Sequence, residues 1–425
     1  MVASAHYPVM IITAHKLITL RDNALTVNHG AVAFSRGTIL DTGTTERILK
    51  KYPAYRVYRL ENTILMPGLI NVHAHLELPP LLDDIRARSF PDWVLNLIRV
   101  KKKLDKTAYT IAAKQNVRLL IQSGTTTVGE ICTHGVSPGV LKQSGLRATI
   151  YKEIISMHPS ALVSPHSSFA ARSLSSLIQT GISPHAPYTV SEAALRHIKK
   201  ISPPQKTRLC MHVAESKDEI RLMRGEKSGF EKLYQAVGWK ASWAPSAGSP
   251  FEFLQRLGLL GPNFLAVHCV QVTDKDISLI RKFGVPVAHC PRSNNETGVG
   301  KMPLKKFLDA GIVVGLGTDS LASAPSLNLW DEMRYTYRIH RSSGIAARDV
   351  VMLATKGGAK ALGMFDAVGS IEPGKRADII AVPLPEKDTG DIYSDLLRET
   401  KSCIMSVVNG KILHKEQSAV PEPIW

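Results

Sequence analysis

The chain of 425 residues is 44% hydrophobic, which is enough for a full core and excludes a mainly disordered protein. No apolar run approaches the roughly 18 residues needed to cross a bilayer, and residues 1–20 lack a basic leader, so we expect a cytosolic protein without a membrane partner. The net charge of +17 is spread along the chain, and no nucleic-acid module surrounds the densest basic run at 99–106, so we expect an anionic small substrate or plain solubility rather than a nucleic-acid partner.

Both ends of the chain carry short β patterns. Residues 1–66 alternate apolar and polar residues in runs separated by Gly, Asn and Asp, as in a small antiparallel β unit. Residues 369–384 and 404–414 return to this pattern, and the second of them contains an Asn-Gly hairpin signal. We therefore predict one small β-sandwich built from both chain ends, with its parts at 1–66 and 366–425.

Between these ends, apolar runs rich in β-branched residues alternate with helical periodicity. Fully buried parallel strands are apolar on both faces, and each is followed by a helix. The pattern predicts an α/β fold with a (β/α)₈ TIM-like barrel over 67–365. The eight predicted strand runs are 64–75, 125–131, 147–155, 181–187, 208–216, 264–270, 285–293 and 313–320.

The sequence LINVHAHLELPP (69–80) predicts half of a metal site. His73 and His75 are two residues apart, so on an extended segment both imidazoles point to the same side. A third imidazole and a carboxylate would complete a shell of three nitrogens and one oxygen, with a position left for water. His212 and Asp319, at the ends of two other predicted strands, are the best candidates. A lone acid at the end of a buried strand would be costly without a metal or a donor.

Two further residues point to proton transfer. Glu215 follows His212 by three residues, which places a carboxylate beside the metal as a proton shuttle requires. The alternative is a carboxylate that only stabilises a helix N-terminus. His268 is either a further metal ligand or a hydrogen-bond partner of the water.

Six strings in this order resemble the amidohydrolase superfamily: MPGLINVHAHLE, SPHAPYTVS, HVAES, VHC, HCPRSN and GLGTDS. The resemblance is to its mononuclear aminohydrolases and chlorohydrolases of nucleobase-like and triazine rings. It implies one divalent metal, Zn²⁺ or Fe²⁺, on His73, His75, His212 and Asp319. It also implies that Glu215 is the proton shuttle and that His268 orients the water. His268 and Asp319 would together accept the proton of the water, and His185 would contact the substrate. Family members are commonly oligomeric, so a homodimer is an expected state.

The string HAHLE and the aromatic pair Phe90 and Trp93 resemble aminodeoxyfutalosine deaminases of the alternative menaquinone pathway. The resemblance implies deamination of 6-amino-6-deoxyfutalosine to futalosine and ammonia. That substrate carries a carboxylate, for which Arg292 would supply a guanidinium. The alternatives for this task are Arg86, Arg88 and Arg99 on the first loop. Glu77 would hold the ribose hydroxyls. The alternatives are a structural salt bridge for Arg292, simple helix packing for Phe90 and Trp93, and pairing of Glu77 with a nearby cation.

Other activities share the same metal shell. They are deamination of S-adenosylhomocysteine, methylthioadenosine or guanine, displacement of chloride from a triazine, and hydrolytic opening of an imidazolone-type ring. A non-catalytic amidohydrolase-like scaffold is the remaining alternative, but it would show gaps at the ligand positions, and the sequence has none.

Overall fold

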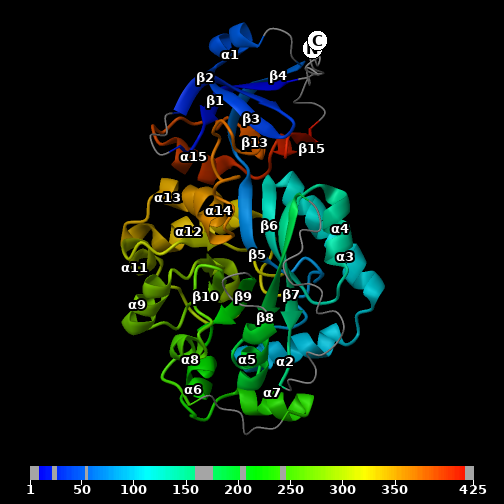
Figure 1. The fold of residues 1–425 in the computed structure, drawn as a ribbon, viewed down its shortest axis with the longest axis vertical. Coiled ribbons are helices and arrows are strands. Elements are labelled where there is room, and N and C mark those ends of the chain that lie inside the picture. The colour runs from blue at the N-terminus through cyan, green and yellow to red at the C-terminus, as the bar shows by residue number, and fades with distance from the viewer. Residues whose placement is uncertain are drawn as a thin grey trace.

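A computed structural model describes residues 9–21, 26–52, 56–157, 176–201, 207–239 and 246–416. Its centre is a barrel of eight strands in consecutive order, each paired in parallel with its neighbours (Figure 1). A bridge between Ala74 and Asp319 joins the first strand to the segment after the last. The strands are β5 (Leu69–Ala74), β6 (Thr125–Cys132), β7 (Arg147–Ile154), β8 (Ile178–Pro184), β9 (Arg208–Val213), β10 (Phe264–His268), β11 (Val287–His289) and β12 (Val314–Leu316).

The predicted barrel is therefore confirmed, and every predicted run overlaps one of these strands, although β8 begins three residues before its predicted run. The strands form because their residues are apolar or β-branched and are buried on both faces, as parallel strands covered by helices must be. The first run proved to span two elements: its start belongs to a strand that ends at Pro67, and only residues from Leu69 onward enter the barrel.

The second unit is one seven-stranded sheet made from both chain ends, as predicted. Its strands are antiparallel except for the pair β1 and β4. Figure 1 shows the first strands and the last ones side by side above the barrel. In spatial order the strands are β15 (Lys411–Lys415), β14 (Met405–Val408), β13 (Ile379–Pro383), β4 (Arg56–Pro67), β1 (Met10–Ile18), β2 (Thr26–Ser35) and β3 (Thr38–Thr44). The domain boundaries at 66/67 and 365/366 stay a prediction.

Most helices follow barrel strands and cover the outside of the barrel. Several begin with a side-chain cap, as when Ser89 accepts a hydrogen bond from the amide of Asp92 at the start of α2. No helix among the described residues combines the length and apolar character that a membrane span requires. The α-helices are α1 (Thr45–Lys51), α2 (Phe90–Lys101), α3 (Lys106–Gln122), α4 (Ser137–Ser144), α5 (Glu192–Ile201), α6 (Lys217–Met223), α7 (Phe230–Val237), α8 (Pro250–Leu257), α9 (Asp274–Phe283), α10 (Pro291–Glu296), α11 (Leu304–Asp309), α12 (Leu329–His340), α13 (Ala347–Met352), α14 (Gly358–Ala361) and α15 (Ile392–Glu399).

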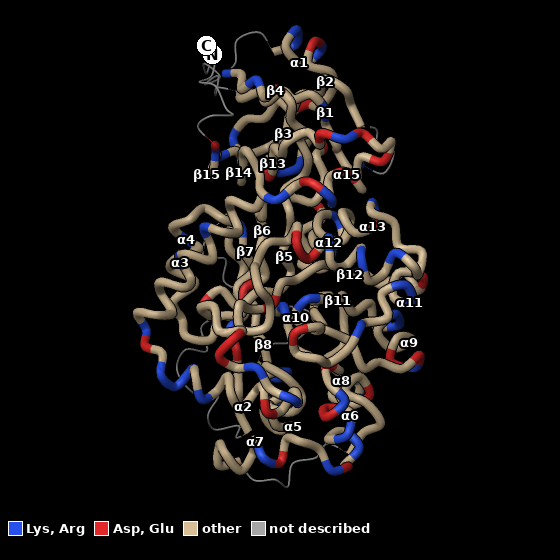
Figure 2. The backbone as a smooth tube through the Cα atoms, turned by 180° about the vertical axis from the view of Figure 1, so that it is seen from behind, with Lys and Arg blue, Asp and Glu red and all other residues tan. Residues whose placement is uncertain are grey.

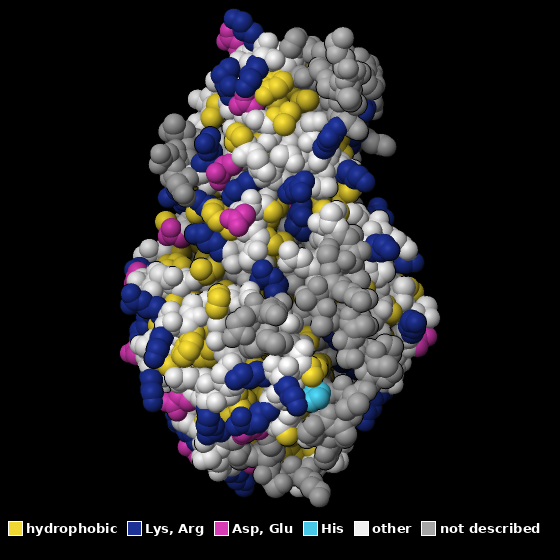
Figure 3. Space-filling model, in the orientation of Figure 1, with side chains coloured by type: hydrophobic (Ala, Val, Ile, Leu, Met, Phe, Trp, Pro, Cys, Tyr) yellow, Lys and Arg dark blue, Asp and Glu magenta, His cyan; other side chains and the backbone are white. Residues whose placement is uncertain are grey.

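Lysine and arginine residues occur on both units. Figure 2 shows them along the backbone of the sheet and of the barrel, and Figure 3 shows them scattered over the face it displays. The positive charge of the chain is therefore distributed over the parts visible in these views.

A buried ion pair joins the two units. The guanidinium of Arg147, at the start of β7, donates to both carboxylate oxygens of Asp378, just before β13, at 2.8 and 2.9 Å. The two side chains are 7% and 1% exposed. Removing one partner of such a pair leaves the other charge buried without compensation.

We expect Asp378→Ala to lower the free energy of unfolding by about 3–5 kcal/mol, measured by urea denaturation. Asp309→Ala is the matched control, because Asp309 pairs with Lys305 on the surface, where ion pairs contribute less than about 1 kcal/mol. Equal, small effects of the two substitutions would contradict a structural role for the buried pair.

Candidate active site

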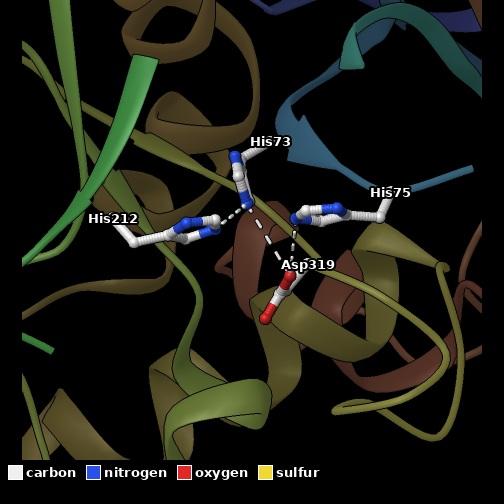
Figure 4. A group of neighbouring side chains, drawn as sticks. All are labelled: His73, His75, His212 and Asp319. Carbon is white, nitrogen blue, oxygen red and sulfur yellow. Dashed lines mark hydrogen bonds and ion pairs between the residues drawn. The ribbon is translucent and has the colours of Figure 1, made fainter. Parts of the chain in front are cut away.

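Three imidazoles and one carboxylate converge at the C-terminal ends of the barrel strands. They are those of His73, His75, His212 and Asp319, and their ligand atoms all lie within 4.8 Å of one another (Figure 4). The Nε2 atoms of His73 and His212 are 3.2 Å apart, and Asp319 Oδ1 lies 3.6 Å from His73 Nε2 and 3.4 Å from His75 Nε2. The structure thus brings together the four predicted ligands.

These separations fit a metal ion. Four ligand atoms at about 2.1 Å from a tetrahedral centre lie roughly 3.4 Å from one another. The three measured pairs are within 0.2 Å of that value. The donor set of three nitrogens and one oxygen suits zinc and ferrous iron equally.

Neighbouring groups fix which atoms face the centre. His212 Nδ1 lies 2.8 Å from the carbonyl oxygen of His185, so this nitrogen carries the proton and the Nε2 lone pair points inward. The hydroxyls of Ser293 and Ser323 donate to Asp319 Oδ2 at 2.6 and 2.8 Å. Oδ1 is left to face the imidazoles, so these hydrogen bonds orient both His212 and Asp319.

The charges of the four groups also suit a cation. Burial lowers the pKa of His75 to about 3 and that of His212 to about 4, so both imidazoles are neutral ligands at pH 7. Burial alone would raise the pKa of Asp319, but the hydrogen bond with His73 and the nearby His75 outweigh it. Its pKa lies well below the ordinary value, and Asp319 is an anion.

The backbone takes an unusual conformation at three strand ends. Ala214, His268, Cys269 and Asp319 have φ values of 53°, 72°, 49° and 59°, in the left-handed region that side chains other than glycine seldom adopt. Each follows or ends a barrel strand. Such strained positions cost of the order of 1–3 kcal/mol each and persist only where the surrounding structure holds them. Here the strained positions are residues of the site, His268 and Asp319, or lie directly next to one, as Ala214 does to Glu215.

Glu215 and His268 lie beside the cluster. Glu215 Oε1 is 3.5 Å from His268 Nε2, and both side chains are buried. Burial, followed by the negative charges of Asp319 and Glu219, raises the pKa of Glu215 well above its ordinary value, so it holds a proton. The carboxylate of Glu219 accepts hydrogen bonds from the amides of Ala214 and Glu215 and thereby holds the turn that presents Glu215.

His268 is neutral, because burial lowers its pKa to about 3. Its Nδ1 lies 2.8 Å from Asn294 Oδ1, so Nδ1 carries the proton and Nε2 is an acceptor toward the centre. A protonated carboxyl and a neutral imidazole therefore face the same point from two strands.

A cavity that is partly open to solvent covers this cluster, and the empty space in it, open solvent included, is about 810 Å³. Aromatic and aliphatic side chains form its walls, and the polar groups gather at one end. Phe90 and Trp93, both predicted as substrate contacts, line it from α2, with ring centroids 5.8 Å apart. The residues that line the cavity include His75, Phe90, Trp93, Val94, Leu97, Ile98, Lys101, Glu153, His185, Tyr188, His212, Glu215, His268 and Asp319.

His185 also lines the cavity, at the end of β8. Its Nδ1 is 2.8 Å from Thr189 Oγ1, whose own hydroxyl donates to the carbonyl oxygen of Ala186. His185 Nδ1 must therefore be the donor, and its Nε2 is an acceptor. Burial holds its pKa well below the ordinary value, so the ring is neutral.

Two predicted substrate contacts do not line the cavity. The carboxylate of Glu77 accepts hydrogen bonds from the amides of Thr133, His134, Val136 and Ser137, three of them at 2.8–3.0 Å, and so fixes the loop after β6. This contact network differs from both expectations, ribose binding and pairing with a cation, because the amides satisfy the carboxylate.

Arg292 is the second such residue. Its guanidinium lies 3.5 Å from Asp331 and 3.7 Å from Glu332, and it donates to Ser326 Oγ at 2.9 Å. These contacts favour the structural salt bridge that was the alternative interpretation of Arg292. The guanidinium is engaged by the first turn of α12.

A model of the amidohydrolase family matches residues 64–413. The chain belongs to the amidohydrolase family. It is accordingly a hydrolytic enzyme, with the barrel and the attached sheet of an amidohydrolase.

Individual amidohydrolases match nearly the whole chain. A 5-methylthioadenosine/S-adenosylhomocysteine deaminase from Syntrophobacter fumaroxidans is 28% identical over 422 residues, covering 94% of this chain and 90% of that protein. An aminodeoxyfutalosine deaminase from Nitratiruptor sp. is 28% identical over 380 residues, covering 87% and 91%. The crystal structure of an adenosine deaminase from Xanthomonas campestris with bound zinc has a TM-score of 0.79 at 25% identity, covering 95% and 92%. The family, the cluster and the zinc-bound neighbour together support a divalent metal at this site.

Sequence reasoning missed three residues of the site. Tyr188 and Asn294 stand inside the strings SPHAPYTVS and HCPRSN, so the motifs already contained them. Lys101 belongs to the basic run at 99–106, which gave no reason to separate one lysine from its neighbours. Lys101 is eleven residues, or three helical turns, from Phe90, and this spacing could have indicated that both lie on the same face of the helix.

Proposed function

We propose that the protein hydrolytically deaminates the adenine ring of a 5′-modified nucleoside, with a divalent metal at His73, His75, His212 and Asp319. The observation that carries the proposal is the placement of Glu215. It is a buried carboxyl that holds a proton, lies 3.5 Å from the neutral His268 and lines the same cavity as the ligand cluster. The relatives named as adenosine-type deaminases support the choice of ring.

The chemistry follows from these charges. A bound divalent metal supplies Lewis-acid activation that brings the pKa of a water toward neutrality. His268, with Asp319, accepts the proton of the water as its oxygen adds to the ring carbon that bears the amino group. Glu215 donates its proton to the adjacent ring nitrogen. His268, with Asp319, returns the proton taken from the water to the amino group, and the deprotonated Glu215 accepts the proton of the adduct's hydroxyl. The carbon–nitrogen bond then breaks, so that ammonia leaves and a carbonyl remains on the ring.

The finer assignment is 6-amino-6-deoxyfutalosine as substrate, with futalosine as product in menaquinone biosynthesis. The aminodeoxyfutalosine deaminase of Nitratiruptor sp. supports it at 28% identity. The relative from Syntrophobacter fumaroxidans, equally similar, favours methylthioadenosine or S-adenosylhomocysteine as the second candidate. Zinc and ferrous iron are both consistent with the ligands, and a homodimer stays a prediction.

The test is ammonia release by the metal-loaded protein from aminodeoxyfutalosine, S-adenosylhomocysteine and methylthioadenosine in parallel. We expect release from at least one, with the highest kcat/KM for aminodeoxyfutalosine. A higher kcat/KM for methylthioadenosine or S-adenosylhomocysteine would retain the reaction and overturn the finer assignment. Ammonia from none of the three, with the metal present at one equivalent, would contradict the proposed function.

A further inference from the structure

One face of helix α2 runs along the cavity from an aromatic end to a cationic end. Phe90 and Lys101 are eleven residues apart, about 16 Å at 1.5 Å per residue. Every turn between them contributes lining residues: Trp93, Val94, Leu97 and Ile98. The cavity is therefore long enough to hold more of a ligand than the ring that meets the metal.

Lys101 is the one cationic side chain that lines this cavity among the residues that the structure describes. The side chain is half-buried, and no other described residue forms a hydrogen bond or ion pair with its ammonium group. Arg292, by contrast, is held by Asp331 and Glu332 of α12. An ammonium that is partly removed from water and faces a cavity is a site for an anionic group.

Glu153 at the end of β7 lines the same cavity and is half-buried. Its Oε2 accepts a hydrogen bond from Thr133 Oγ1 at 2.7 Å, which leaves Oε1 for a ligand. Burial alone would raise the pKa of Glu153, but the positive charge of Lys101, together with the hydrogen bond from Thr133, outweighs it and holds the pKa below the ordinary value. Glu153 is thus an anionic acceptor whose environment includes both Lys101 and the metal ligands.

We propose that Lys101 binds a carboxylate on the 5′ substituent of the substrate, and that Glu153 accepts hydrogen bonds from the sugar hydroxyls nearer the ring. This proposal rests on the proposed function and assigns the substrate class of the same cavity: adenine nucleosides whose 5′ substituent bears a carboxylate, in preference to those without one. It also replaces Arg292 and Glu77, the residues to which the sequence assigned these two tasks.

The substrates of the relatives provide a matched test. S-adenosylhomocysteine and methylthioadenosine share the adenine, the ribose and the sulfur, but only the first carries a carboxylate. Aminodeoxyfutalosine carries its carboxylate on an aromatic ring. A residue that binds the carboxylate must therefore affect the first and third nucleosides and spare methylthioadenosine.

We expect Lys101→Met to lower kcat/KM about 10–100-fold for the two carboxylate-bearing nucleosides, and less than twofold for methylthioadenosine. Lys101→Arg keeps the cation and is expected to restore most of the loss. Lys103→Met is the control, because Lys103 is exposed just beyond the same end of α2. Equal losses on all three nucleosides, or no loss on any, would overturn the role of Lys101.

Glu153→Gln tests the second half of the proposal. The glutamine carbonyl can still accept the hydrogen bond from Thr133, so the loop contact is retained. We expect KM to rise about tenfold for all three nucleosides, which share the ribose, while kcat changes little. A fall in kcat with KM unchanged, or no change in either, would contradict sugar binding by Glu153.

Dissociation constants of the same nucleosides, measured by calorimetry, separate this proposal from the proposed function. The wild-type protein could release no ammonia and still bind S-adenosylhomocysteine at least tenfold more tightly than the Lys101→Met variant. That result would overturn deamination and support carboxylate binding by Lys101. Equal binding by the two proteins would overturn Lys101, whether or not ammonia is released.

Discussion

Glu215→Gln is expected to lower kcat by about 10³-fold while metal content and thermal stability stay unchanged, because a positioned general acid contributes roughly 10²–10⁴ in rate. Glutamine is nearly isosteric with the protonated glutamic acid. The amide of residue 215 can therefore still donate to Glu219, and the turn is preserved. The substitution removes the transferable proton and little else.

The measurement is steady-state ammonia release at saturating substrate, with metal content determined on the same samples. Glu226→Gln is the matched control, since Glu226 is an exposed glutamate eleven residues further along the chain. If Glu215→Gln kept more than a tenth of the wild-type kcat, the proton shuttle would have to be another group. A loss of metal in this variant would place Glu215 among the ligands instead.

His212→Ala is expected to reduce bound metal from one equivalent per chain to near zero and to abolish ammonia release. The reason is geometric: His212 Nε2 stands 3.2 Å from His73 Nε2, with its other nitrogen fixed by the His185 carbonyl. The substitution by alanine removes one of the four ligands. Metal analysis by mass spectrometry of extensively dialysed protein measures the change.

His414→Ala on β15 serves as the control, because this histidine lies in the other sheet and outside the cavity. It should retain one equivalent of metal and full activity. Stoichiometric metal in both variants would mean that the ion is bound elsewhere or by a different set of residues.

The barrel could be predicted because a parallel strand that is buried on both faces is apolar whichever elements pack against it. A strand such as β10 is buried at all five positions and therefore reads as an apolar run wherever it occurs. The metal ligands were predictable for a related reason, since the strand ends of a parallel barrel meet on one face. His73, His75, His212 and Asp319 needed only to stand at those ends to be brought together.

The parts that could not be predicted depend on contacts between loops. Glu77 is satisfied by four amides of the loop after β6, more than fifty residues away in the chain, and no local pattern shows that these amides point at it. Arg292 lies at a strand end as predicted, but α12 supplies two acids that hold it. Position at a strand end predicts which residues are near the site, whereas loop geometry decides which of them face the cavity.

The most direct measurement of the central claim is mass analysis of the product formed from an adenine nucleoside by the metal-loaded protein in ¹⁸O-labelled water. Hydrolytic deamination predicts a product in which a carbonyl with one ¹⁸O atom has replaced the amino group, and one ammonia per product. It also predicts no product after metal removal, and product formation about 10³-fold slower with Glu215→Gln. Free adenine, or an oxygen that does not come from water, would contradict the account.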